Sequence, residues 1–204
     1  MQNDLCDDDT LAKAAQLMAQ GDATASEALD ALVLRFPNDP RLTFLQASML
    51  VSVGRLVAAH DAFARTLALA PDFALARYQY GFFLLTSGEV ARALEVWGPL
   101  DRLPDGDYLR SVLEGMRCLV RDDFAGVRNH FQIAISRNKE NEPLNNDLRL
   151  LLQRIDQTIQ PVNQSAYDAA LQVTGDLESP QPAAEPEAMS EASLLLQRFG
   201  TKLH

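Results

Sequence analysis

The side chains that carry most enzyme chemistry are few in this sequence, and their spacing matches no familiar kind of site. His60, His130 and His204 are the three histidines, and none is spaced from a cysteine or an acidic residue as in a metal site. Cys6 and Cys118 are too few for a disulfide framework and lack zinc-ligand spacing. We therefore expect no catalytic centre, no metal and no cofactor, and we interpret His60 and His130 as surface or partly packed side chains.

Other chemical motifs are equally sparse. Glycine-rich phosphate loops and nucleophile elbows are absent from the sequence. The acidic run at residues 7–9 could hold a cation weakly, but carboxylates near a helix start also interact favourably with the helix dipole, and we favour that interpretation. The expectation is a protein that is not an enzyme.

Composition restricts the partners of the chain. The 204 residues carry a formal net charge of -10 and a pI near 4.7, which argues against nucleic acid, because phosphate binding needs a concentrated basic surface. No apolar run approaches the roughly 18 to 20 residues that cross a bilayer, and the N-terminal residues are acidic where a signal peptide would be basic and then apolar. We expect no membrane insertion and a cytoplasmic location. The reducing conditions of the cytoplasm also fit a chain with only two cysteines.

A pattern of small and aromatic residues recurs along the sequence at a fixed interval. Gly54, Ala59 and Phe63 are followed one repeat of about 34 residues later by Gly88, Ala93 and Trp97. Each unit contains two apolar-periodic segments separated by a small or turn residue, which predicts a helical hairpin.

In the second unit, the first helix is expected at residues 41–53 and the second at residues 56–70. Gly54 supplies the turn between them, and Pro71 ends the second helix. The small residues Ala47 and Gly81 stand where the first helix of a hairpin must approach its neighbour closely.

These positions resemble the tetratricopeptide repeat (TPR) family. The matching residues of the third unit are Tyr80, Gly81, Leu84, Gly88, Ala93, Trp97 and Leu100, and those of the second are Ala47, Leu50, Gly54, Ala59, Phe63 and Pro71. A weaker fourth unit contains Gly115, Cys118, Asp122, Phe124, Val127, Phe131 and Ala134, and a degenerate first unit contains Leu17, Gly21, Ala25, Leu29 and Leu32. The resemblance implies an all-α, right-handed superhelix of about four hairpins.

The C-terminal part departs from this repeat. Apolar residues at three- and four-residue steps over residues 144–159 predict an amphipathic helix that caps the last hairpin, and a short helix is expected at 164–173. The acidic, proline-rich residues 175–190 predict a flexible linker before a last amphipathic segment. We therefore expect a repeat domain at residues 1–160 and an appendage at residues 161–204.

The resemblance also implies a binding groove, because family members commonly bind peptides on the concave face formed by the first helix of each hairpin. The repeat register assigns nine residues to that face, and they are mostly apolar or aromatic, which suits an amphipathic helix or an extended apolar segment. They are Phe44, Ser48, Val51, Tyr78, Phe82, Leu85, Val112, Met116 and Leu119. The alternative is that neighbouring helices cover these side chains.

Two functions fit these expectations. The first is an adaptor or scaffold that binds another protein or peptide in the groove. The second is a chaperone of the bacterial secretion type, which would keep a hydrophobic client soluble, although the long C-terminal extension is a departure from that class. The tail carries a further hypothesis, since its apolar residues could dock into a groove of this chain or of a second copy, address another protein, or have no role. These residues are Leu194, Leu195, Leu196 and Phe199.

Overall fold

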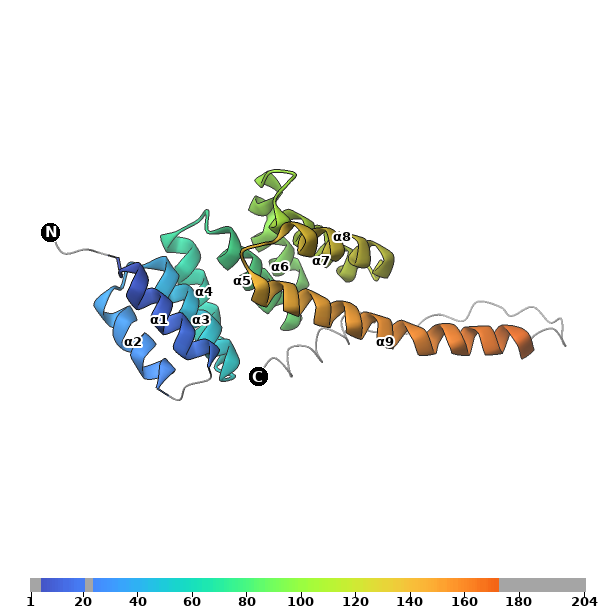
Figure 1. The fold of residues 1–204 in the computed structure, drawn as a ribbon, viewed down its shortest axis with the longest axis horizontal. Coiled ribbons are helices and arrows are strands. Elements are labelled where there is room, and N and C mark those ends of the chain that lie inside the picture. Colours follow the sequence, from blue (N-terminus) through green and yellow to red (C-terminus); the bar gives the residue numbers. More distant parts are fainter. Residues whose placement is uncertain (1–4, 21–23, 173–204) are drawn as a thin grey trace. The chain divides into compact units, whose positions relative to one another are not determined.

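The computed structural model describes residues 5–20 and 24–172, the last of these, 158–172, as backbone only. Within these ranges the chain forms helices and no strand, so the predicted all-α class is confirmed there (Figure 1). The helices are α1 (Asp8–Ala19), α2 (Ala25–Arg35), α3 (Pro40–Ser52), α4 (Leu56–Leu69), α5 (Ala74–Thr86), α6 (Val90–Trp97), α7 (Tyr108–Val120), α8 (Phe124–Arg137) and α9 (Glu142–Gln172), with a 3-10 helix η1 (Gly98–Arg102) after α6.

The described residues divide into two compact units between Leu100 and Asp101. The first unit contains α1 to α6, and the second contains α7 to α9. The division falls inside the region 1–160 that the sequence predicts as one repeat domain. The division coincides with the early end of α6. Pro99 follows α6 at the position equivalent to Arg65, through which the longer α4 continues. A proline inside an α-helix removes a hydrogen bond and clashes with the preceding turn, so the chain changes to η1.

Consecutive helices pack together in pairs. Helix α3 packs on α4, α5 on α6, and α7 on α8. For the second repeat, the predicted helices at 41–53 and 56–70 are found at Pro40–Ser52 and Leu56–Leu69. The predicted boundaries therefore agree with the structure to within one residue.

The turns inside these three pairs share one backbone conformation. Gly54 and Gly88 have φ angles of 72° and 83°, and Asp122, at the equivalent position of the next pair, has a φ of 57°. This left-handed region is open to glycine, while among other residues mainly asparagine and aspartate tolerate it. The same turn thus recurs at the sequence interval that defines the repeat.

A close approach between the two helices of a pair also recurs. A Cβ atom built on Gly81 would lie 2.1 Å from the Trp97 ring, and one on Gly115 would lie 2.3 Å from the Phe131 ring. Both rings are fully buried. In α3 the equivalent residue is the buried Ala47. A large aromatic ring on the second helix therefore packs directly onto the backbone of the first helix.

A buried carboxylate fixes the N-terminal segment against α3. Asp39 is fully buried and accepts hydrogen bonds from the backbone N–H of Cys6 at 2.9 Å and of Arg41 at 3.0 Å. The Arg41 guanidinium also bonds to Asp39 at 2.8 Å and pairs with Asp8 at 2.6 Å. Burial opposes ionisation of Asp39, but these hydrogen bonds outweigh it and lower the pKa of the carboxyl below its ordinary value. The segment before α1 is thus tied to a residue 33 positions away.

In the second unit, α9 packs on α8. The buried side chains of Asn138 and Asn145 hydrogen-bond to each other at 3.0 Å, and Asn145 also donates to the Asn138 carbonyl at 3.1 Å. Helix α9 runs without interruption to Gln172, so the separate helix expected at 164–173 is instead the end of α9. Pro161 removes one hydrogen bond from α9, and helices can absorb such a loss as a local bend.

The turn conformation predicts that alanine substitutions at Gly88 and Gly98 have different effects on stability. A Cβ atom added at either glycine would meet nothing within 4 Å, so only the backbone conformation distinguishes the two sites. Gly88→Ala should lower the free energy of unfolding by about 1 kcal/mol, because alanine is strained at positive φ. Gly98→Ala, at a φ of -47°, should leave the free energy of unfolding unchanged or raise it. Urea denaturation followed by circular dichroism measures both, and equal effects at the two sites would contradict the assignment of the turn.

The buried Asp39 predicts a pH-dependent contribution to stability. Because its pKa is lowered on folding, the contribution should be present above pH ~4, the ordinary pKa of an aspartate, and be lost as the pH falls through the lower folded-state pKa. At neutral pH Asp39→Asn should lower the free energy of unfolding by about 3 kcal/mol, since Arg41 then faces a neutral amide. Urea denaturation at a series of pH values tests this, and a difference between wild type and Asp39→Asn that stays constant down to pH ~2.5 would contradict it.

Candidate functional site

The structure separates the nine residues of the predicted groove by their exposure. On α3, Phe44, Ser48 and Val51 are all partly exposed. On α5, Phe82 is partly exposed, whereas Tyr78 and Leu85 are buried. The first unit thus keeps four of the predicted residues accessible to a partner.

The three predicted residues of α7 are not accessible. Val112 and Met116 have exposed fractions of 0%, and Leu119 has 1%, so they belong to the core and cannot contact a partner in this conformation. The physical reason is that buried residues of α7 occupy more than half of its circumference, as the wide run Leu109–Leu119 of mostly buried residues indicates. The repeat register gives the direction of a side chain, but it does not tell which apolar side chains are covered.

The four accessible residues lie on two helices that touch. Ser48 Oγ of α3 lies 3.3 Å from Gln79 Oε1 of α5. The Phe44 ring lies 5.2 Å from the Phe73 ring, and the Phe82 ring stacks on Tyr78 with 6.3 Å between centroids. We call the surface formed by Phe44, Ser48, Val51 and Phe82 the α3/α5 face. Two buried aromatic rings support this face, Phe63 next to Phe44 and Tyr78 next to Phe82.

A histidine cluster that the sequence analysis did not identify joins α4, α5 and α6. The Nε2 atom of His60 lies 3.0 Å from the Tyr80 hydroxyl and 2.8 Å from the Arg92 guanidinium, which also pairs with Glu89. A guanidinium only donates hydrogen bonds, so Nε2 accepts and the ring proton is on Nδ1, which lies 3.5 Å from Asp61. Burial raises the pKa of Tyr80. The Nε2 lone pair is thus engaged by the Arg92 guanidinium.

Both cysteines are enclosed by the helices around them. Cys6 and Cys118 are buried, free thiols, and burial raises the pKa of each. A nucleophilic cysteine needs the opposite shift, toward the thiolate. Within residues 5–20 and 24–157, moreover, no three side chains of histidine, cysteine, aspartate or glutamate come together in a group that could hold a metal ion.

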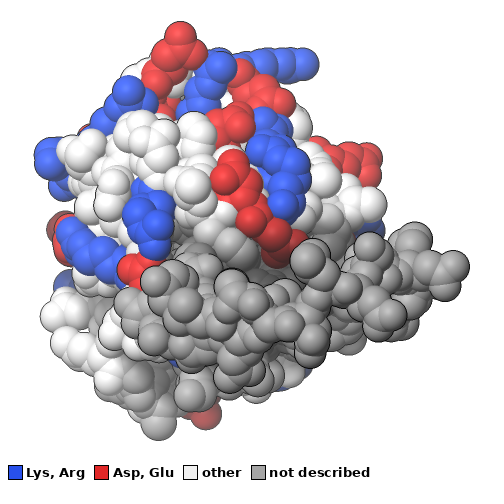
Figure 2. All heavy atoms as spheres, turned by 90° about the vertical axis from the view of Figure 1, so that its right-hand side faces the viewer, with Lys and Arg blue, Asp and Glu red and all other residues white. Residues whose placement is uncertain are grey.

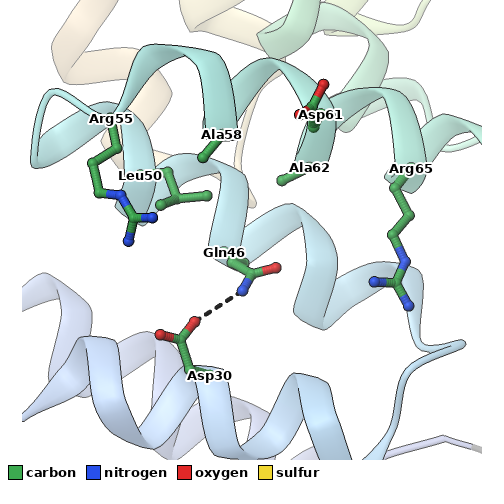
Figure 3. Close-up of a pocket in the computed structure, with 8 residues that line it drawn as sticks. All are labelled: Asp30, Gln46, Leu50, Arg55, Ala58, Asp61, Ala62 and Arg65. Carbon is green, nitrogen blue, oxygen red and sulfur yellow. Dashed lines mark hydrogen bonds between the residues drawn. The ribbon is translucent and has the colours of Figure 1, made fainter.

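A pocket opens in the first unit between α2, α3 and α4, with a volume of about 390 Å³ (Figure 3). Its apolar residues are Leu50, Ala58 and Ala62, and its polar residues are Asp30, Gln46, Arg55, Asp61 and Arg65. Gln46 of α3 donates a hydrogen bond to Asp30 of α2 at 2.8 Å. In Figure 3, Arg55, which precedes α4, and Arg65, in its third turn, extend toward α2 on either side of this hydrogen bond. The sequence analysis did not predict this pocket.

The charged surface of the chain agrees with its composition. On the face drawn in Figure 2, basic and acidic side chains are interspersed over the described residues, and no continuous basic area is seen there. Among the described residues, no helix is both long enough and apolar enough to cross a membrane.

The predicted tail motif lies outside the described residues, so the tail hypotheses stay predictions. Its residues are Leu194, Leu195, Leu196 and Phe199.

Comparison with known proteins adds no assignment. No protein-family model matches the chain, and no curated protein matches its sequence. The function must therefore be argued from the residues and their arrangement alone.

Proposed function

We propose that this chain is an adaptor of the tetratricopeptide type, a right-handed superhelix of helical hairpins capped by α9, that binds an apolar segment of another protein on its α3/α5 face. The observation that carries the proposal is the triple recurrence of one hairpin design. The left-handed turn recurs at Gly54, Gly88 and Asp122. The contact between an aromatic ring and a glycine recurs at Gly81 and Gly115.

The α3/α5 face supports binding as the role of these hairpins. Phe44 and Phe82 stay partly exposed although a buried aromatic ring lies next to each, Phe63 beside Phe44 and Tyr78 beside Phe82. An aromatic side chain in this setting gains free energy when a partner covers its exposed part, at about 25 cal/mol per Å² of apolar surface. Two such rings on adjacent helices suit a segment with two apolar anchors, as in the recognition of an amphipathic helix.

The chemistry of the described residues supports a role without catalysis. His60, which lies on α4 of the same unit, uses its ring nitrogen for Arg92 and Tyr80. Both thiols are buried and favour the protonated form. Two buried, free thiols also support work in a reducing compartment such as the cytoplasm.

The proposal predicts which apolar side chains matter for binding. Peptides selected from a random display library against the full chain should carry two or more apolar residues at helical spacing. Phe82→Ala and Phe44→Ala should each weaken the selected peptides about tenfold, because both remove a central aromatic contact. Fluorescence anisotropy measures the binding, and circular dichroism should show the helical content nearly unchanged.

Leu34→Ala is the matched control, because Leu34 is 83% exposed and stands on α2, which contributes no residue to the α3/α5 face. Its affinity for the selected peptides should equal that of the wild type. Weakening by Leu34→Ala equal to that by Phe82→Ala would contradict the proposal. A large loss of thermal stability in Phe82→Ala would instead assign Phe82 to the core.

A further inference from the structure

The pocket between α2, α3 and α4 lies on a different side of α3 from the α3/α5 face. Successive residues rotate by about 100° around a helix, so Gln46 and Leu50 point away from Phe44, Ser48 and Val51. A ligand in the pocket would therefore be independent of the peptide proposed for the α3/α5 face.

The repeat explains why the pocket is open. Shifting its residues by one repeat, 34 positions, replaces Gln46 by Tyr80 and Ala58 by Arg92. Around α4, α5 and α6, these two larger side chains converge on His60, at 3.0 Å and 2.8 Å. Around α2, α3 and α4, the shorter Gln46 bonds to Asp30, and Ala58 has only a methyl group in the place of the long Arg92 side chain. The smaller side chains at these two positions thus help to leave the pocket of about 390 Å³ open.

Shifting by one repeat also replaces one acidic residue by a basic one. Arg92 forms an ion pair with Glu89, and the residue equivalent to Glu89 is Arg55. Since Ala58 stands in the place of Arg92, Arg55 faces an empty position where its counter-charge would be. The complementary group at that position is a carboxylate, because a guanidinium binds a carboxylate through two parallel hydrogen bonds.

A second guanidinium lies at the other end of the pocket. Arg65 donates a hydrogen bond to the Pro37 carbonyl at 2.6 Å, and neither Arg65 nor Arg55 forms an ion pair with a carboxylate among the described residues. Arg55 and Arg65 are ten residues apart on one helix axis, which corresponds to about 15 Å. An extended chain covers about 13 Å in four residues, so carboxylates four or five residues apart match the two arginines.

We propose that this pocket binds an extended acidic segment of a partner protein, with one carboxylate over Ala58 paired with Arg55 and a second, four or five residues along, paired with Arg65. The apolar floor of Leu50 and Ala62 accommodates small side chains between the two carboxylates. The pocket's own two carboxylates have other partners, since Asp30 accepts a hydrogen bond from Gln46 and Asp61 lies 3.5 Å from His60 Nδ1.

The test uses the full chain and a labelled synthetic peptide of about ten residues, with two glutamates four residues apart among alanine, serine and proline. Fluorescence anisotropy at low salt, where the Debye length is about 30 Å, should show binding of this peptide and none of its glutamine counterpart. Arg55→Ala and Arg65→Ala should each weaken binding about fivefold. Arg102→Ala, which removes the same charge from an exposed residue of η1, should leave the affinity unchanged.

Ala58→Arg distinguishes binding in the pocket from general attraction between opposite charges. The change adds a positive charge, so attraction alone would strengthen binding of the acidic peptide. If the peptide binds in the pocket, the new arginine should fill it, as Arg92 fills the equivalent position of the next repeat, and weaken binding at least tenfold. Gln46→Tyr fills the pocket without a change of charge and should weaken binding as well. Either result in the opposite direction, with circular dichroism unchanged from the wild type, overturns the proposal.

Two further outcomes would also overturn it. Equal binding of the glutamate and glutamine peptides would show that no carboxylate is recognised. Binding that appears only after Asp176, Glu178, Glu185, Glu187 and Glu191 are changed to their amides would show that the occupant is the chain's own acidic stretch and not a partner.

Discussion

The contact of an aromatic ring with the backbone of the preceding helix is the constraint on which the hairpins depend. Trp97 lies against Gly81 and Phe131 lies against Gly115, each so close that a single added methyl group would overlap the ring. The Trp97 indole also donates a hydrogen bond to the Tyr78 carbonyl at 3.0 Å, which fixes the level of α6 along α5. Once the pair is fixed, the rotation of α5 about its own axis is fixed too, and with it the exposure of Phe82, the residue after Gly81. The proposed binding face is therefore a consequence of the packing of α5 against α6.

The departures from the repeat are as informative as the repeat itself. Pro99 shortens α6 where the equivalent helices continue, and the chain divides into two compact units just after it. Asp122 takes the left-handed turn that glycine takes in the other two pairs, which aspartate tolerates at some strain. Ala58 stands where the next repeat has Arg92, and a pocket is left. Each departure changes one local feature while the packing of the pair is kept.

Much of the fold could be predicted from the sequence, because its signals are local and periodic. The 34-residue interval, the turn glycines and the small residues at the close approach are all visible in the sequence, and the helices of the second repeat were predicted to within one residue. The predicted direction of Phe44 and Phe82 agrees with their partial exposure. Whether a peptide binds there stays a prediction.

Other features depend on contacts between distant residues, and no local pattern carries them. The burial of Val112, Met116 and Leu119 depends on which neighbours cover α7. The bond between Asp39 and Cys6 joins residues 33 positions apart, and the partners of His60 come from two other helices. The pocket was in principle detectable, because aligning Ala58 with Arg92 and Gln46 with Tyr80 reveals two smaller side chains in the first interval. Such a signal lies in the differences between repeats and not in the residues that they share.

The most direct test of the central contact is a double-mutant cycle on Gly115 and Phe131, with the free energy of unfolding measured by urea denaturation. Helix propensity alone predicts that Gly115→Ala stabilises the protein by about 1 kcal/mol. The ring contact predicts the opposite sign, a loss of about 2 kcal/mol from overpacking, and a much smaller loss or a gain when Phe131 is replaced by leucine. A stabilising Gly115→Ala, or an equal effect in both backgrounds, would contradict the account of how these hairpins are held together.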